Sequence, residues 1–204
     1  FRQFWEQTLK QTRSRIAEKG AQVKIEPAQT PFEQVDFYDL QFPGFDADPI
    51  HAWLSGPAGF MESGSYPVML HYHGYGGGRG IPGAYPHWAM SGYIHVSMDS
   101  RGQGGDFGGY SVTPDPYPAS HHARGFTTNG IESRETYYYR RLMTDAVMAV
   151  DAVMDLPSID LNRIYATGAS QGGGLALTVG ALHDNVRAVL PDVAFLCNFR
   201  RGMD

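Results

Sequence analysis

The stretch YATGASQGGGLALTV, from Tyr165 to Val179, surrounds one serine with four glycines. Gly168 lies two residues before Ser170, and Gly172 lies two residues after it. The residues before the serine favour a strand and those after it favour a helix, so the serine falls at a strand-to-helix turn. A turn this tight strains the serine backbone, and side chains two residues on either side would clash with neighbouring strands. Glycine at both positions removes that clash.

The pattern Gly-x-Ser-x-Gly between a strand and a helix is the nucleophile elbow of α/β hydrolases. Ser170 is therefore the predicted nucleophile. A helix that begins near Gln171 directs its N-terminal N–H groups and the positive end of its dipole toward the serine. The backbone N–H of Gln171 is the predicted first donor of an oxyanion hole. The alternative is a glycine-rich turn with an incidental serine, which the flanking strand and helix disfavour.

A second oxyanion donor is expected in the loop that follows an earlier strand. The segment HYHGYGGGRG, from His71 to Gly80, ends such a strand, and its glycines let the backbone approach a substrate. By its position the N–H of Tyr75 is the candidate donor, and we expect the tyrosine ring to wall the acyl pocket. The alternative is a glycine-rich turn with a packed tyrosine.

The 204 residues are predicted to form a single α/β domain, residues 1–204. An amphipathic helix ending near Gly20 and an antiparallel pair of strands come first, and strands then alternate with helices. This alternation predicts a mostly parallel sheet with helices on both faces. The predicted strands are Phe32–Phe42, Ile50–Pro57, Pro67–His73, Tyr93–Asp99, Arg163–Ser170 and Ala188–Leu196, and the later helices are Ser133–Leu156 and Gly172–His183.

Composition and charge exclude several classes of protein. The net charge is −5 and the basic residues form no stripe, so we expect no nucleic-acid partner. The uncharged apolar runs are far shorter than a bilayer span, so we expect no membrane partner. The single cysteine, Cys197, permits no internal disulfide, and the N-terminal segment lacks the apolar core of a signal peptide. Both observations favour a cytoplasmic location, and no cofactor is expected.

The histidines and one arginine suggest structural roles. His71 and His73 share a face of a predicted strand, but no carboxylate or cysteine lies at ligand spacing, which favours core histidines over a zinc site. His121 and His122 are predicted to be a solvated pair in a loop. Arg101 follows a strand in a glycine-rich turn, and its planar guanidinium is expected to hold nearby loops together.

Six ordered motifs extend the pattern over most of the chain. They are HGYGGGRG (His73–Gly80), MDSRGQGG (Met98–Gly105), GFTTNGI (Gly125–Ile131), TYYYRRLMTDA (Thr136–Ala146), GASQGGG (Gly168–Gly174) and PDVAFLCNFRR (Pro191–Arg201). Together they resemble carbohydrate esterase family 7, the acetyl xylan esterases and cephalosporin-C deacetylases. The resemblance runs from Phe4 almost to the last residue.

The resemblance implies an α/β-hydrolase fold and removal of acetyl groups from sugar hydroxyls and small esters, cephalosporin C among them. It implies that Ser170 is the nucleophile and that Gln171 and Tyr75 form the oxyanion hole, with Tyr75 also contacting the substrate. RGQGG at Arg101–Gly105 matches a family signature. Members of the family are typically intracellular homo-hexamers whose active sites face an internal chamber.

The acid and the histidine of a catalytic triad are harder to assign. α/β Hydrolases follow the order Ser, acid, His. After Ser170 the sequence offers only Asp184, Asp192 and Asp204, with His183 as the one histidine. At a rise of roughly 1.5 Å per helical residue, His183 would lie roughly 20 Å from the serine. Since the resemblance places both residues on later strands beyond a helical cap, we expect them beyond residue 204.

The sequence thus predicts a serine esterase that deacetylates xylo-oligosaccharides and related small acetyl esters. Two alternatives remain open. One is another α/β hydrolase, such as a peptidase or a lactone hydrolase. The other is a non-catalytic binding or assembly module that keeps the fold without the chemistry.

Overall fold

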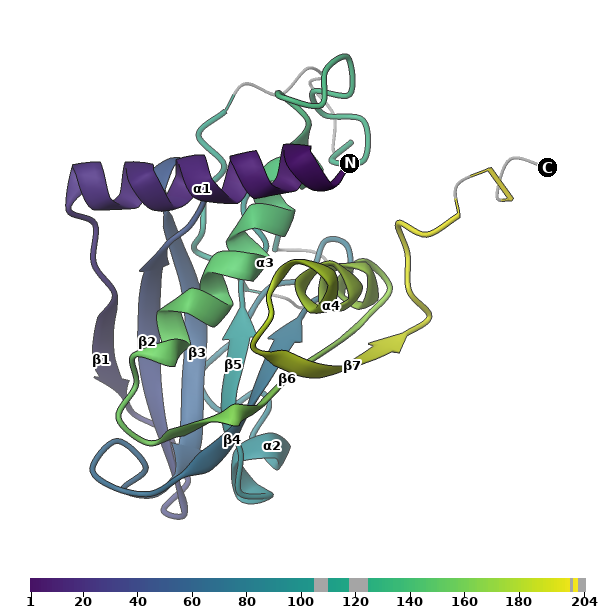
Figure 1. The fold of residues 1–204 in the computed structure, drawn as a ribbon. Coiled ribbons are helices and arrows are strands. Elements are labelled where there is room, and N and C mark those ends of the chain that lie inside the picture. Colours follow the sequence, from purple (N-terminus) through teal and green to yellow (C-terminus); the bar gives the residue numbers. More distant parts are fainter. Residues whose placement is uncertain (105–109, 118–124, 199, 202–204) are drawn as a thin grey trace.

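The computed structural model describes residues 1–104, 110–117, 125–198 and 200–201. A seven-stranded sheet with the order β1-β2-β3-β5-β4-β6-β7 forms its centre (Figure 1). The strands are β1 (Lys24–Ala28), β2 (Val35–Pro43), β3 (Pro49–Pro57), β4 (Tyr66–Tyr72), β5 (Ile94–Met98), β6 (Ile159–Ala169) and β7 (Val186–Asp192). The helices are α1 (Arg2–Lys19), α2 (His87–Met90), α3 (Tyr138–Met154) and α4 (Gln171–Leu182), with a 3-10 turn η1 (Phe45–Ala47).

The sheet combines an antiparallel half and a parallel half. β1, β2, β3 and β5 pair antiparallel in that order, whereas β5, β4, β6 and β7 pair parallel. Five strands therefore run in one direction, and only β1 and β3 run in the other. The predicted antiparallel opening and the mostly parallel sheet are both confirmed.

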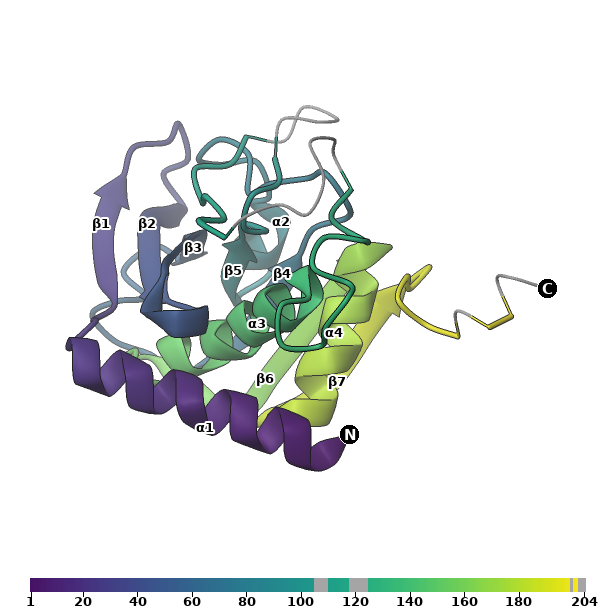
Figure 2. The same ribbon diagram turned by 90° about the horizontal axis from the view of Figure 1, so that it is seen from above.

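Helices cover both faces of the sheet. α1, α3 and α4 lie on one face and the short α2 lies on the other (Figure 2). Side chains alternate along each strand, so Val68, Leu70 and Tyr72 of β4 join the core beneath α3 and α4. α3 contributes a buried apolar stripe that includes Leu142 and Val150. Every residue of β5, at the centre of the sheet, is buried.

The structure also contains elements that the sequence pattern did not predict. β1 is an edge strand whose sequence KIEPA contains two charged residues and a proline, and its burial does not alternate as in a half-buried strand. α2 is a single turn, too short to show a helical period. β7 begins at Val186 and ends at Asp192, before the predicted end at Leu196. α3 begins at Tyr138, because residues 133–137 form turns.

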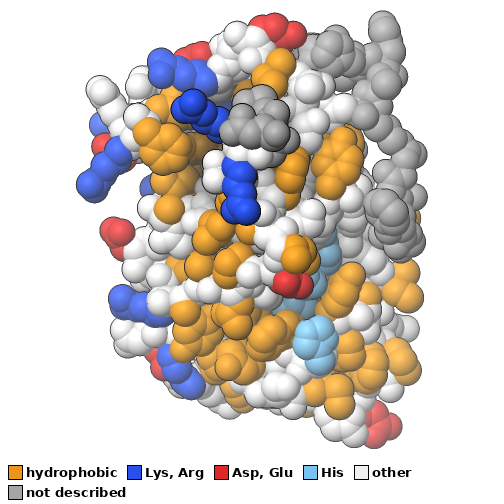
Figure 3. Space-filling model, turned by 90° about the vertical axis from the view of Figure 1, so that its right-hand side faces the viewer, with side chains coloured by type: hydrophobic (Ala, Val, Ile, Leu, Met, Phe, Trp, Pro, Cys, Tyr) orange, Lys and Arg blue, Asp and Glu red, His pale blue; other side chains and the backbone are white. Residues whose placement is uncertain are grey.

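β7 forms the other edge of the described sheet, and the surface on this side is rich in hydrophobic side chains (Figure 3). Leu190 on β7 and Val193 and Phe195 after it are exposed. In the ranges that the structure describes, no helix has the length and apolar character needed to cross a lipid bilayer.

Candidate active site

Ser170 lies between β6 and α4, at the tip of a strained turn. Its φ of 54° and ψ of −118° put a non-glycine residue in a region that costs free energy, on the order of 1–3 kcal/mol. Two backbone hydrogen bonds hold the turn: the Ser170 N–H donates to the Asp192 carbonyl (2.9 Å), and the Phe195 N–H donates to the Ser170 carbonyl (2.8 Å). The strand-to-helix turn expected from the sequence is present, and the chain around β7 supports it.

The two glycines of the elbow are required by the neighbouring strand β4. A Cβ on Gly168 would lie 2.6 Å from the Tyr72 carbonyl oxygen, and one on Gly172 would run into the same oxygen. Tyr72 is buried, and its backbone belongs to the sheet. The predicted clash with a neighbouring strand is confirmed for both positions.

Gln171 is the first residue of α4 and is fully buried. The first N–H groups of a helix have no intrahelical partner, so its backbone N–H is available beside Ser170. The side chain lies in a polar cluster under the turn. Its Oε1 accepts hydrogen bonds from the Tyr139 hydroxyl (2.9 Å) and from Gln103 Nε2 (2.9 Å).

Tyr75 lies in the loop after β4, next to the elbow. A Cβ on Gly74 would lie 3.9 Å from the Ser170 Cβ, so the start of this loop runs directly beside the serine. The Tyr75 hydroxyl accepts a hydrogen bond from the Phe126 N–H (3.1 Å), and the two rings meet edge to face at 5.7 Å. Among the described residues no hydrogen-bond acceptor engages the Tyr75 N–H. The structure thus brings Tyr75, Ser170 and Gln171 together.

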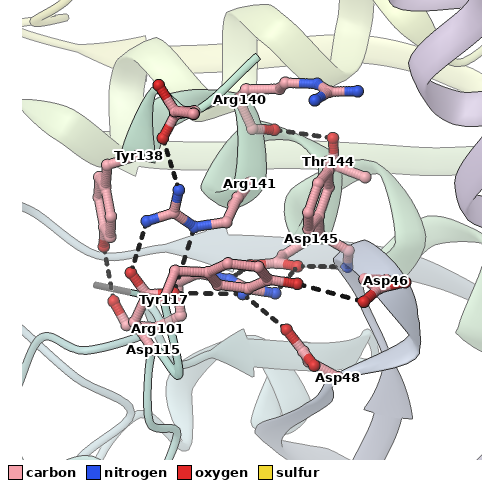
Figure 4. A network of polar contacts seen from close by, with 12 residues as sticks. Asp46, Asp48, Arg101, Asp115, Tyr117, Tyr138, Arg140, Arg141, Thr144 and Asp145 are labelled. Carbon is pink, nitrogen blue, oxygen red and sulfur yellow. Dashed lines mark hydrogen bonds and ion pairs between the residues drawn. The ribbon is translucent and has the colours of Figure 1, made fainter. Parts of the chain in front are cut away.

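Arg101 holds several loops beneath the site, as the sequence predicts. It is fully buried and forms a two-point ion pair with Asp145 on α3. Its Nη1 also reaches Asp48 after η1 (3.0 Å) and Asp115 (3.4 Å), and Arg141 pairs with Asp115 as well (Figure 4). Burial by itself would lower the pKa of Arg101, but the carboxylates of Asp145 and its neighbours raise it, so the guanidinium stays charged.

His71 of β4 and His73, just after the strand, pack on the sheet face opposite α3 and α4. The His71 and His73 rings lie 4.7 Å apart, and His73 Nε2 contacts the Ser97 hydroxyl at 2.8 Å. Burial, followed by the effect of His87, lowers the pKa of His71 to about 4, and burial with His71 lowers that of His73 to about 3. No metal-binding group of three or more His, Cys, Asp or Glu occurs within the described ranges. His73 is buried and His71 is half-buried, so both pack as parts of the sheet face; His121 and His122 lie outside the described residues.

His183 is held away from the serine at the opposite end of α4. Its Nε2 lies 3.0 Å from Asp151 Oδ1, and its Nδ1 accepts a hydrogen bond from the Asn185 N–H. Arg13 forms an ion pair with the same carboxylate, Asp151. In the part of the chain that the structure describes, no histidine or carboxylate bonds to the Ser170 hydroxyl; Asp204 lies outside that part.

Gln103 is the site residue that sequence reasoning missed. It belongs to the RGQGG signature, is almost fully buried, and accepts a hydrogen bond from the Gly76 N–H at 2.7 Å. An amide side chain in a glycine-rich turn just after a strand was the available signal. Its contact with Gln171, however, joins residues 68 positions apart, which no local pattern reports.

A strained serine between a parallel strand and a helix, on a mostly parallel sheet with helices on both faces, defines the α/β hydrolases. The chain belongs to the acetyl xylan esterase (AXE1) family, whose profile matches residues 1–204. The resemblance predicted from the six motifs is thereby confirmed.

Solved structures and a curated relative agree with this assignment. An acetyl xylan esterase from Paenibacillus sp. R4 is 36% identical, with a TM-score of 0.86 over 100% of this chain and 62% of that one. Acetyl xylan esterase 1 from Thermoanaerobacterium sp. JW/SL YS485 is 27% identical, with a TM-score of 0.85 over 99% of this chain and 60% of that one. Acetyl esterase Axe7A from Xylanibacter ruminicola is 27% identical over 100% of this chain and 45% of its own length. The chain thus spans less than two thirds of each of these relatives.

Proposed function

We propose that the protein is a serine esterase that removes acetyl groups from acetylated xylo-oligosaccharides and small acetyl esters, including the acetyl ester of cephalosporin C. The strained Ser170 turn carries the proposal, because it sets a serine hydroxyl between the loop of Tyr75 and the first N–H of α4. Membership of the acetyl xylan esterase family supports the choice of an acetyl group.

In this mechanism the Ser170 oxygen attacks the acetyl carbonyl carbon and gives up its proton to a base. The carbonyl oxygen becomes an oxyanion, which accepts hydrogen bonds from the N–H groups of Tyr75 and Gln171. The bond to the sugar oxygen breaks, the sugar leaves as an alcohol with a proton from the same base, and an acetyl-serine ester remains. Water then attacks this ester and releases acetate, which restores the serine.

The base and its supporting acid are proposed to lie beyond residue 204, as the resemblance implies. His183 is already paired with Asp151 at the other end of α4 and is not a candidate. We further propose a cytoplasmic homo-hexamer, by resemblance to the family. Native mass spectrometry of the complete natural protein tests the assembly, since a monomer would contradict it.

The experiment that tests the function uses the complete natural protein that carries these residues. We expect hydrolysis of acetylated xylan and p-nitrophenyl acetate, and labelling of Ser170 by a fluorophosphonate probe. Ser170→Ala should abolish both. Ser91→Ala, at an exposed serine after α2, is the matched control and should leave both unchanged.

The two alternatives give different results in this experiment. Faster turnover of a peptide or a dienelactone than of any acetyl ester would indicate a different α/β hydrolase. Absence of probe labelling in the complete, folded protein would indicate a non-catalytic module.

A further inference from the structure

The side chains of Gln103 and Gln171 form a closed amide pair beneath the elbow. Gln103 Nε2 donates to Gln171 Oε1 at 2.9 Å, and Gln171 Nε2 donates back to Gln103 Oε1 at 3.2 Å. Both side chains are buried. A buried amide left without partners is unfavourable, so a pair that satisfies both amides has a strong preference for one geometry.

Two tyrosines of α3 determine which way each amide points. The Tyr138 hydroxyl donates its only proton to the Arg101 carbonyl at 2.6 Å, so its oxygen can only accept, and it accepts from Gln103 Nε2 at 2.8 Å. The Tyr139 hydroxyl donates to Gln171 Oε1 at 2.9 Å. Gln103 therefore presents Oε1, not its NH₂ group, to the loop after β4.

Each end of the amide pair is attached to one half of the predicted oxyanion hole. Gln103 Oε1 accepts from the Gly76 N–H at 2.7 Å, and this fixes the peptide unit that follows Tyr75. Gln171 carries the other predicted donor on its own backbone. The pair thus joins the loop after β4 to the N-terminus of α4, two segments whose separation sets the distance between the two donors.

We infer that Gln103, through its amide pair with the Gln171 side chain, is a positioning residue that sets the spacing of the oxyanion donors Tyr75 N–H and Gln171 N–H. The inference rests on the proposed function. The amide pair touches no reacting atom; it acts through the two backbone segments that it holds. Because the oxyanion forms only as the reaction proceeds, a misplaced donor lowers kcat and leaves substrate binding largely unchanged.

The test is steady-state kinetics on p-nitrophenyl acetate with the complete natural protein. Gln103→Met keeps the side-chain length and removes every amide hydrogen bond. We expect kcat to fall about 10- to 100-fold, less than the full loss of an oxyanion donor, while KM changes less than about 3-fold. Thr144→Val is the control, because it removes a buried hydrogen bond to the Arg140 carbonyl on α3, and its kcat should match the wild type.

A pair that acts as a unit also predicts non-additive losses. Gln171→Met keeps the backbone donor and removes only the side-chain amide. The double variant Gln103→Met/Gln171→Met should then lose about as much kcat as Gln103→Met alone. The inference would be overturned if the double variant lost kcat by the product of the two single losses, or if the variants changed only KM.

Milder variants keep the inference testable if Gln103→Met does not fold. Gln103→Glu places an ionised acceptor opposite the acceptors Tyr138 Oη and Gln171 Oε1, and protonation restores one donor. The ratio of its kcat to the wild-type kcat should therefore rise as the pH falls from about 8 to about 5. If the ratio of the two kcat values does not change with pH, or if a folded Gln103→Met protein has the wild-type kcat, the positioning role of Gln103 is refuted and the proposed function stands. An inactive wild-type protein would refute the proposed function together with it.

Discussion

Arg101 and Asp145 face each other with neither side chain exposed to solvent, joined by two hydrogen bonds from Nε (2.6 Å) and Nη2 (2.8 Å). The pair connects the turn after β5 to the middle of α3. Removing one member of a buried ion pair leaves the other charge unpaired in the low-dielectric interior of the protein. Replacing either Arg101 or Asp145 should therefore destabilise the loops and the helix that the pair joins.

Asp145→Ala should lower the free energy of unfolding by about 3–5 kcal/mol, because it leaves the Arg101 guanidinium with only its weaker contacts to Asp48 and Asp115. Chemical denaturation measures the change. Arg2→Ala is the matched control, since it breaks the exposed Arg2–Glu6 pair and should cost less than about 1 kcal/mol. Equal losses in the two variants would contradict the importance of the buried pair.

Gly172→Ala and Gly74→Ala make the same chemical change in different surroundings. At Gly172 the new methyl group would run into the Tyr72 carbonyl, and we expect a loss of about 1–3 kcal/mol together with loss of probe labelling at Ser170. At Gly74 the nearest atoms are 3.7 Å and 3.9 Å away and the backbone is not left-handed, so stability should change by less than about 0.5 kcal/mol. Thermal denaturation separates the two variants, and a stable Gly172→Ala protein would disagree with the crowding seen here.

The parts of this fold that were predictable are those with a local physical signature. Ser170 is recognisable because a strained turn needs glycine at Gly168 and Gly172, and the requirement is visible within five residues. The strands β3, β4 and β5 are largely apolar and lie near Gly or Pro, whereas β6 begins at Ile159, before its predicted start at Arg163, because its first residues include polar and exposed ones. By contrast, β1 is a short edge strand with two charged residues and a proline, and its sequence resembles a loop.

The polar framework under the site was not predictable in detail, since its contacts join distant segments. The sequence indicates that Arg101 binds loops together, but not that Asp145, 44 positions later, is its main partner. Gln103 is similar, because its function depends on two tyrosines and a glutamine brought together only by the packing of α3 and α4. The roles of Ser170, Tyr75 and Gln171 in catalysis stay predictions.

Tyr75 provides a test of acyl specificity. Its hydroxyl is tied to the Phe126 N–H and its ring packs against Phe126, so we expect a fixed wall that favours acetate over longer acyl groups. In a series of p-nitrophenyl esters, kcat/KM should be highest for acetate. Tyr75→Ala should raise the ratio of butyrate to acetate by about 10-fold or more. Tyr110→Ala, at an exposed tyrosine, should leave the ratio unchanged; a wild-type optimum at butyrate or longer would contradict the wall.

The histidines on the opposite sheet face predict acid sensitivity. Burial lowers the pKa of His71 to about 4, that of His73 to about 3 and that of His95 well below its ordinary value, whereas an unfolded histidine titrates near 6.5. Above about pH 6.5 both states hold these rings neutral and stability is at its full value. As the pH falls toward the folded pKa, the unfolded chain binds protons that the folded chain does not. Stability should therefore decrease by about 2 kcal/mol per histidine between pH 7 and pH 5.

Denaturation curves at several pH values test this slope in a range where most carboxylates stay ionised. His71→Gln should lose about a third of the decrease, because one of the three rings no longer titrates. Ser97→Ala is the matched control: it removes the hydroxyl that contacts His73 Nε2 and lowers stability, but it keeps all three titrating rings. Its slope against pH should equal that of the wild type. A His71→Gln protein with an unchanged slope would mean that other groups cause the acid sensitivity.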